Sequence, residues 1–330
     1  MRLLITGVSG LVGSNLAAAA VQQSWEVLGT WRDTPVEITG AATQGLDMAD
    51  RHACVEAAMA FEPDVLVHAA GSVHATRMEH EPYAAQLAQV GTVHTLAAAR
   101  TVRAHYVLIS CDWVYSGLRP PHQRWSEDDP PEPINAWGRS RQACELATED
   151  YNGSWLITRP AGLYGVNLAR PKGGSGELSE YVWTHSSMPL RWVRRLRHAE
   201  PLPAPADGYR SPTYAWDYAQ RLCELIAQDC EGVYNTAGPD SLNRREYLRL
   251  LARSFDCDPA LVRDGTTAGF LEACGEDPHL AMPSNTALSD DKSSFVLGHP
   301  AVDARTGHHL MRSQLREVLS GADPAQAVTI

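Results

Sequence analysis

The sequence is short of positive charge and of long apolar runs. It holds 28 Lys and Arg against 39 Asp and Glu, a net charge of −11, which argues against nucleic acid or an anionic membrane surface as a partner. No segment reaches the ~20 consecutive apolar residues of a membrane span, and the apolar run before Gly7 is too brief for a secretory signal. We therefore expect a cytoplasmic protein.

Paired cysteines and metal-binding spacings are also absent. The seven cysteines are odd in number and none forms a C-x-x-C pair, so we expect reduced thiols rather than a disulfide framework or a zinc site. His68, His74 and His80 recur at intervals of six residues, which match neither one face of a helix nor the usual ligand spacings. We expect no metal site.

A glycine-rich turn near the N-terminus is the strongest positive signal. Arg2–Thr6 predicts a buried strand, and an alanine-rich helix follows the turn. Gly7 permits a tight turn, Gly10 lets the backbone approach a pyrophosphate, and Gly13 allows close packing of the helix on the strand. The helix N-terminus adds free N–H groups for phosphates. This order predicts a dinucleotide site, with a merely tight turn as the alternative; its expected members are Gly7, Ser9, Gly10, Leu11, Val12 and Gly13.

A second predicted strand, Trp25–Thr30, bears on the choice of cofactor. It ends close to Arg32 and Asp33. An arginine at this position suits the 2′-phosphate of NADP, whereas an acidic residue suits the ribose hydroxyl of NAD. Arg32 favours NADP, and Asp33 keeps NAD open.

Strands and helices then alternate through the first half of the chain. Val65–His68, Tyr106–Ser110 and Trp155–Arg159 are of buried-strand type, and Pro82–Arg100 predicts a long helix. This alternation predicts an α/β fold with a doubly wound parallel sheet of the Rossmann type. Ligands bind at the carboxyl ends of such strands, where the small residues Ala69, Ala70 and Gly71 would let a cofactor lie.

Several blocks of sequence carry a family resemblance beyond the glycine turn. They are Leu46-Asp47-Met48, His68-Ala69-Ala70, Glu79-His80-Glu81-Pro82, Ser110-Cys111-Asp112-Trp113-Val114-Tyr115, Arg159-Pro160-Ala161-Gly162-Leu163-Tyr164-Gly165, Arg210-Ser211-Pro212-Thr213-Tyr214, Gly232-Val233-Tyr234-Asn235-Thr236-Ala237-Gly238 and Pro283-Ser284-Asn285-Thr286-Ala287-Leu288. Over residues 1 to about 295 the chain resembles the extended short-chain dehydrogenase/reductases, in particular their dTDP-4-dehydrorhamnose reductase branch. The resemblance implies that Asp47 and Met48 also border the cofactor.

The catalytic positions of that family are not matched. The family uses a tyrosine as proton donor, a lysine four residues later, and a hydroxyl that orients the carbonyl. Here the corresponding residues are Trp137, Arg141 and Cys111. An indole N–H cannot release a proton usefully near neutral pH, and a thiol is a poor hydrogen-bond donor. Arg141 keeps a positive charge that suits a ribose, a phosphate or a carboxylate.

Two other side chains are candidates for the missing acid. His74 follows a predicted strand and titrates near neutral pH, so it is a candidate general acid or base; a surface loop histidine is the alternative. Tyr164 ends another predicted strand and carries a phenol, although packing or lining the substrate is the plainer interpretation. Cys111 is a weak candidate as a nucleophile because Asp112 is adjacent.

The length of 330 residues suits about two domains. We expect a Rossmann domain over 1–165 and about 211–236. A smaller, discontinuous substrate lobe is expected over about 166–210 and 237–295, and a helix and tail over 296–330. A local run of arginines, Arg191 to Arg197, would either hold an anionic substrate or form one solvated helix face.

The leading functional hypothesis is an NADP(H)-binding enzyme with a non-standard active site. It would act on a sugar-nucleotide-like or polar secondary-metabolite substrate, by carbonyl reduction or by a redox-neutral reaction. The alternative is a catalytically silent, cofactor-binding regulatory or scaffold subunit. The expected partner is a small, anionic or sugar-like molecule, and a homodimer is compatible with the fold family.

Overall fold

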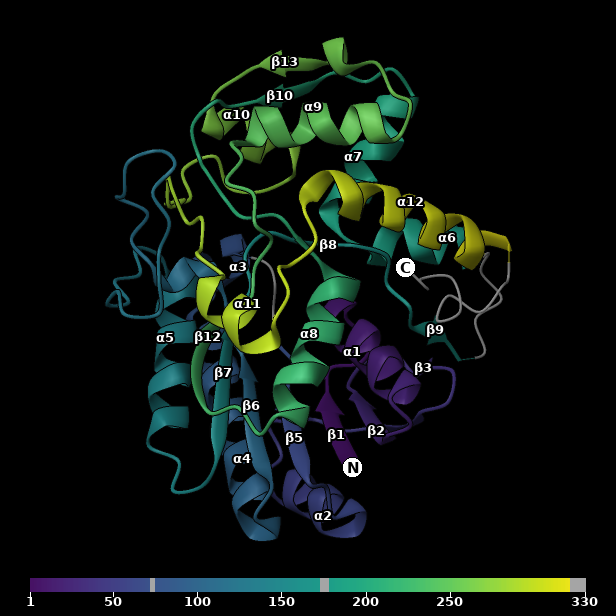
Figure 1. Cartoon of the computed structure of the whole chain (residues 1–330), viewed down its shortest axis with the longest axis vertical. Coiled ribbons are helices and arrows are strands. Elements are labelled where there is room, and N and C mark those ends of the chain that lie inside the picture. The colour runs from purple at the N-terminus through teal and green to yellow at the C-terminus, as the bar shows by residue number, and fades with distance from the viewer. Residues whose placement is uncertain (72–74, 173–177, 321–330) are drawn as a thin grey trace.

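A parallel sheet forms the centre of the protein in the computed structural model, which describes residues 1–71, 75–172 and 178–320. Within these residues the sheet has seven strands in the order β12-β7-β6-β5-β1-β2-β4, and every neighbouring pair is parallel (Figure 1). Its strands are β1 (Arg2–Thr6), β2 (Glu26–Trp31), β4 (Ala42–Gly45), β5 (Val65–His68), β6 (His105–Ile109), β7 (Trp155–Arg159) and β12 (Gly232–Asn235). This topology confirms the predicted doubly wound α/β fold.

Helices cover both faces of the sheet. One face carries α1 (Leu11–Gln22) and α8 (Ala215–Ala227), which pack on each other. The other carries α2 (Arg51–Phe61), α4 (Pro82–Val102) and α5 (Ala136–Glu149), where α4 contacts both of its neighbours. Right-handed crossovers between parallel strands require this two-sided arrangement.

The central strands are apolar throughout because both of their faces are buried. In β1, Leu3 and Ile5 join the apolar cluster under α1 and α8, whereas Leu4 joins the cluster under α2 and α4. All three side chains are at most 1 % exposed. Side chains alternate across a strand, so a continuous apolar run is what a sheet covered on both faces requires.

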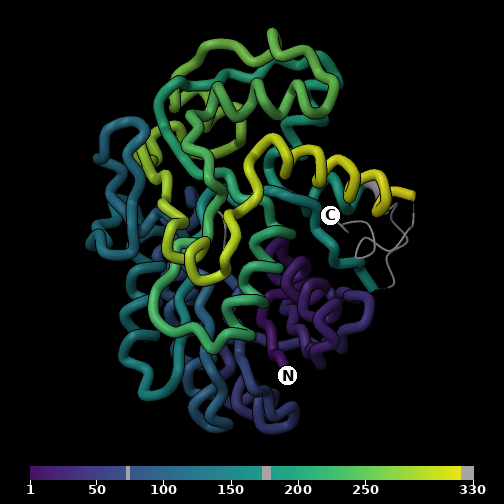
Figure 2. The backbone as a smooth tube through the Cα atoms, in the orientation of Figure 1, coloured from purple at the N-terminus to yellow at the C-terminus, as the bar shows by residue number. Residues whose placement is uncertain are grey.

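A smaller lobe lies beyond the carboxyl ends of the strands (Figures 1 and 2). It contains α6 (Leu178–His185), α7 (Met188–Arg197), β10 (Leu202–Ala204), α9 (Arg244–Ser254), η2 (Pro259–Leu261), β13 (Val262–Asp264) and α10 (Thr267–Ala273). β10 and β13 pair in parallel although they are far apart in the sequence. The predicted domain limits themselves stay a prediction.

Short elements connect the two parts. They are α3 (Ala75–His80), η1 (Asp112–Val114), β8 (Leu163–Tyr164) with β11 (Thr213–Tyr214), β3 (Val36–Glu37) with β9 (Arg170–Pro171), and α11 (Asp291–Leu297). The last helix, α12 (Ala304–Ser320), packs on α9, and Figure 2 shows the yellow tube of α12 beside green α9. Nowhere in the described part of the chain is a helix both long and apolar enough to cross a membrane.

Candidate functional site

The glycine turn after β1 has the geometry of a phosphate cradle. Gly7 has φ +78°, and a Cβ there would come within 2.7 Å of the Ala70 backbone. A Cβ at Gly13 would collide with the backbone of Gly7 and Val8, because α1 packs directly on the turn. A Cβ at Gly10 would instead meet only the Gly7 oxygen, at 3.4 Å. Each glycine therefore has the position that its predicted role requires, and the space at Gly10 is open.

The N-terminus of α1 faces this open space without a capping side chain. Gly10 is the N-cap residue, no side chain bonds to the first turn, and that turn holds no acidic residue. The unpaired N–H groups of Leu11, Val12 and Gly13 and the positive end of the helix dipole suit a phosphate. Asn167 holds the other side of the turn, since its Nδ2 donates to the carbonyl of Ser9 at 2.9 Å.

Hydrogen bonds join the ends of β1 and β5. The Thr6 hydroxyl lies 2.9 Å from His68 Nδ1 and accepts from the Ala70 N–H at 3.3 Å. Burial, and then the nearby Arg141, lower the pKa of His68 to about 3. His68 is therefore neutral at physiological pH, and its role is to fix Ala69, Ala70 and Gly71 beside the glycine turn.

Arg32 lies at the end of β2 in an exposed ion pair. Its Nε donates to both Asp33 carboxylate oxygens, at 3.0 and 2.9 Å, and about half of the Arg32 side chain is exposed. Asp47 accepts from the Ala49 N–H nearby, while Met48 packs on Gly91 of α4. Because exposed ion pairs contribute little stability, Arg32 is able to exchange Asp33 for a phosphate.

Trp137 lies in the first turn of α5 and packs on an aromatic neighbour. Asn135 caps this helix, accepting from the Gly138 N–H at 2.9 Å while its own amide donates to the carbonyl of Ala281. The rings of Trp137 and Trp113 lie 5.0 Å apart between centroids at 49°. The indole nitrogen of Trp137 is buried and has no hydrogen-bond partner among the described residues. At the position where the resemblance in the sequence predicts the family's phenol, the structure therefore has a packed indole.

Arg141 follows Trp137 by one helical turn and is 6 % exposed. Its guanidinium lies against Gly71. Burial, and then Asp112, raise the pKa of the neighbouring Cys111 to about 12. Cys111 is consequently a thiol near neutral pH and not an activated nucleophile.

The structure does not bring Tyr164 to Trp137 and Arg141. Tyr164 packs in the core under α12, with its ring 5.0 Å from His308 and 5.9 Å from Tyr247. Its hydroxyl faces the carbonyl of Ala304, and burial holds its pKa well above the usual range. Its strand turns into the smaller lobe, which carries the phenol away from Trp137. His74 falls in 72–74, outside the described residues.

Two arginines that the sequence analysis did not identify, Arg210 and Arg244, lie beside the site of Trp137 and Trp113. The Cζ of Arg210 is 4.8 Å from the centroid of the Trp113 ring, and its Nη2 is buried without a hydrogen-bond partner. The Cζ of Arg244 is 4.2 Å from the Phe270 ring. Burial, and then Arg210, lower the pKa of Arg244. Arg210 belongs to a block that resembles the family, whereas no local pattern marks Arg244.

The carboxylate of Asp112 cannot neutralise both Arg210 and Arg244. Asp112 lies 3.9 Å from the Nε of Arg210 and also accepts a hydrogen bond from Thr286. Burial raises the pKa of Asp112. By contrast, Arg194 and Arg195 of the predicted basic run pair with acidic residues on or beside α7, which is typical of a solvated helix face.

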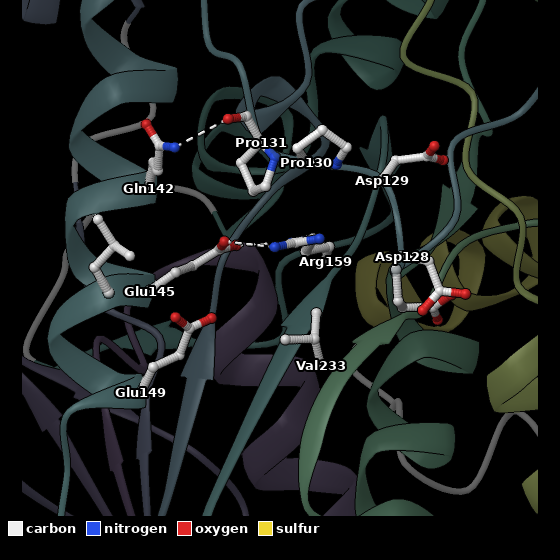
Figure 3. A pocket seen from close by; sticks show the side chains of 11 residues that line it. Asp128, Asp129, Pro130, Pro131, Gln142, Glu145, Glu149, Arg159 and Val233 are labelled. Carbon is white, nitrogen blue, oxygen red and sulfur yellow. Dashed lines mark hydrogen bonds and ion pairs between the residues drawn. The ribbon is translucent and has the colours of Figure 1, made fainter.

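The cavity in Figure 3 lies away from these residues. Its volume is about 260 Å³, and it is bordered by α5, by the loop before it and by β12. Arg159 and Glu145 face each other across it in a two-bond ion pair, with N–O distances of 2.9 and 2.7 Å (Figure 3). Both side chains are at most 3 % exposed, so the pair holds α5 to the end of β7.

Comparisons with known proteins relate this geometry to a family. The family model described as "RmlD substrate binding domain" matches residues 1–299. The methionine adenosyltransferase 2 subunit beta of Rattus norvegicus is 30% identical over 283 residues, which cover 82% of this chain and 77% of that protein. The dTDP-4-dehydrorhamnose reductase of Mycolicibacterium smegmatis is 27% identical, covering 89% and 79%.

Solved structures agree in fold. A dTDP-4-dehydrorhamnose reductase from Bacillus anthracis, in complex with NADP, superposes with a TM-score of 0.75 at 21% identity, covering 94% of this chain and 98% of that one. A UDP-glucose 4-epimerase from Thermus thermophilus, in complex with NAD, gives 0.75 at 20% identity, covering 96% and 99%. The resemblance in the sequence is confirmed: the chain belongs to the RmlD substrate-binding domain family and has the extended short-chain dehydrogenase/reductase fold.

Proposed function

We propose that this chain binds NADP(H) at the glycine turn and a sugar-nucleotide-like anion beside Arg210 and Arg244, and that it acts through binding rather than through reduction. The observation that carries the proposal is the packed indole of Trp137 where the family has its proton-donating phenol. When bound, NADP(H) supplies a hydride donor or acceptor. The residues described around Trp137 supply no matching acid.

The cofactor part rests on the open space at Gly10. A phosphate needs close backbone approach and free N–H groups, and Gly10 together with the uncapped α1 provides both. Arg32 supports NADP because its guanidinium is exposed at the end of β2. The Bacillus anthracis relative is in complex with NADP, which agrees with this choice.

The ligand part rests on two arginines that share one carboxylate. Arg210 and Arg244 each lie on an aromatic ring, and each lacks a close ion pair with any described residue. Arg245, next in the chain, pairs with Asp264 at 3.1 Å. Both Arg210 and Arg244 are half-buried, and positive charge that is partly removed from water without a close partner is costly. A diphosphate or carboxylate would relieve that cost. A structural neighbour from Thermotoga maritima holds UDP-glucose, which supports a sugar nucleotide as the ligand class.

A second candidate function is catalysis with a different acid. Relatives named reductases support it, as does the arginine pair, which suits a small-molecule substrate. Water or His74 would supply the proton for carbonyl reduction, or would move a proton on the substrate in a redox-neutral reaction. The relative from Rattus norvegicus, named as a subunit, supports a regulatory or scaffold role instead.

Calorimetry and absorbance together test the proposal. We expect wild type to bind NADPH and UDP-glucose but to leave NADPH unoxidised with dTDP-4-dehydrorhamnose. Turnover by wild type would overturn the non-reducing role. Arg244→Gln should weaken UDP-glucose binding about tenfold, the loss expected for a charged hydrogen bond. Arg245→Gln, whose partner is Asp264, is the matched control and should change little.

A further inference from the structure

We infer that the ligand presents an oxyanion, a carboxylate in place of a reactive carbonyl, to Trp137 and Arg141. This inference rests on the proposed function, because it concerns the same second ligand. It narrows the ligand class from any sugar nucleotide to one whose sugar itself carries an acidic group.

The first observation is a buried cation without a counter-charge. Arg141 is 6 % exposed, and no described residue forms a hydrogen bond or ion pair with it. Glu145 lies one turn further along α5, but both of its oxygens bind Arg159. Asp112 is bound by Thr286 and lies near Arg210. A buried guanidinium in this state needs an anion that these side chains do not provide.

The second observation is an unpartnered donor on the same helix face. Trp137 and Arg141 are four residues apart in α5, so their side chains lie one above the other. The indole nitrogen of Trp137 is buried and has no partner in the part of the chain that the structure describes, and packing against Trp113 fixes its ring. An indole N–H only donates. Both groups therefore require acceptor atoms.

The bound cofactor does not supply a counter-charge for Arg141. Its negative groups are the pyrophosphate and the 2′-phosphate, which suit the N-terminus of α1 and Arg32. The hydroxyls of its nicotinamide ribose and its carboxamide oxygen accept hydrogen bonds but carry no negative charge. The anion must therefore come from the second ligand.

A carboxylate fits these donors better than a carbonyl does. A guanidinium binds two carboxylate oxygens at once, whereas a ketone offers one neutral oxygen. The buried Nη2 of Arg210, also unpartnered, adds to the positive surroundings. The substitutions of the family's phenol and lysine thus replace a proton relay by two hydrogen-bond donors.

A matched pair of sugar nucleotides tests the inference on the full chain saturated with NADPH. UDP-glucuronate and UDP-glucose differ by a carboxylate on the sugar. We expect wild type to bind UDP-glucuronate at least tenfold more tightly, by calorimetry. Trp137→Phe keeps an aromatic ring and removes the N–H, and Arg141→Met keeps length and removes the charge. Each variant should reduce that preference, measured as the ratio of the two dissociation constants, at least threefold.

Controls separate this inference from the proposed function. Arg139→Met, on the exposed side of α5 near Glu79, should keep the full preference. Wild type that binds both sugar nucleotides equally would overturn the carboxylate inference alone. Wild type that binds NADPH but neither sugar nucleotide would overturn the ligand part of the proposed function and this inference with it. A melting temperature near that of wild type shows that each variant is folded.

Discussion

The guanidinium of Arg141 lies against Gly71, in the space that a side chain at residue 71 would need. Gly71 follows β5, whereas Arg141 lies in α5, so the contact joins two elements that border the expected cofactor site. The absence of a side chain at Gly71 is what lets the guanidinium lie there. A methyl group at this position would displace the cation without touching the sheet.

Substitution of Gly71 by alanine should therefore affect binding more than folding. We expect Gly71→Ala to weaken NADPH binding about tenfold, equivalent to about 1.4 kcal/mol, with little change in melting temperature because residue 71 is exposed. Calorimetry with NADPH measures the effect. Gly269→Ala in α10, where a Cβ would meet only Thr266, is the control. Unchanged affinity in Gly71→Ala would show that Arg141 does not contribute to the cofactor site.

The glycine turn gives a second prediction with opposite outcomes at two positions. Gly10→Ala places a methyl group in open space, so the free energy of unfolding should change by less than about 0.5 kcal/mol. The same methyl group would occupy the space that the cofactor phosphate needs, so NADPH affinity should fall about 100-fold. Gly13→Ala forces α1 away from the backbone of Gly7 and should cost about 1–3 kcal/mol of stability. Urea unfolding and calorimetry on both variants test this contrast. Equal destabilisation by the two would contradict it.

The ion pair of Arg32 and Asp33 predicts how cofactor choice can be changed. Removing the competing carboxylate in Asp33→Asn should free Arg32 and raise NADPH affinity a few-fold. Arg32→Gln should lower NADPH affinity about tenfold and leave NADH affinity unchanged, since only NADPH carries the 2′-phosphate. The NADPH effect should shrink at high salt because the site is exposed. Loss of NADH affinity in Arg32→Gln would argue against this role.

His308 gives a prediction about pH. It is fully buried, neither ring nitrogen has a partner among the described residues, and burial lowers its pKa to about 3. An unfolded chain has an ordinary histidine pKa near 6.5. Between these values the unfolded state binds the extra proton, so stability rises with pH by about 1.4 kcal/mol per unit for this residue.

Replacing this histidine by leucine should remove that dependence. We expect His308→Leu to be about 1 kcal/mol more stable at pH 7, because an unsatisfied polar group leaves the core, and to lose less stability at pH 5. His68→Leu should instead be less stable than wild type at pH 7, because it removes the hydrogen bond between His68 and the Thr6 hydroxyl. Urea unfolding at the two pH values measures both. A His308→Leu variant as acid-sensitive as wild type would be incompatible with a neutral buried ring.

The buried pair of Arg159 and Glu145 predicts a large loss of stability. Glu145→Gln leaves the Arg159 charge buried with Tyr115 and a neutral amide, which should cost about 3–5 kcal/mol in urea unfolding. Glu81→Gln breaks an exposed pair with Arg77 and should cost less than about 0.5 kcal/mol. Similar losses in the two variants would mean that the buried pair contributes no more than a surface pair.

The fold could be predicted because its signals are local. Gly7, Gly10 and Gly13 each meet a steric requirement of one strand–turn–helix unit, and that unit is complete within the first residues of the chain. The apolar run of β5 likewise reflects burial on both faces. Such patterns need no knowledge of distant residues, so the parallel sheet and the cofactor turn were determined by the sequence itself.

The candidate site could be predicted only in part. The resemblance in the sequence predicts that Trp137, Arg141 and Cys111 stand where the family has its catalytic residues, but it does not predict which charges remain unpaired. Arg141 lacks a counter-ion because Glu145 is bound by Arg159. The role proposed for His74 stays a prediction.

Tertiary structure decided the rest, because burial and pairing depend on residues far apart in the chain. Tyr164 and Arg244 show this in opposite directions. The phenol that ends a predicted strand is enclosed by Tyr247 and His308, whereas Arg244, which no sequence pattern marks, lies close enough to Arg210 for the two charges to repel each other. The sequence by itself determined the sheet and the glycine turn, and it predicts the loss of the family's proton relay. Only the packing of the smaller lobe against the strand ends decided which polar groups remain free to bind a ligand, since a charge is available only when no other side chain reaches it.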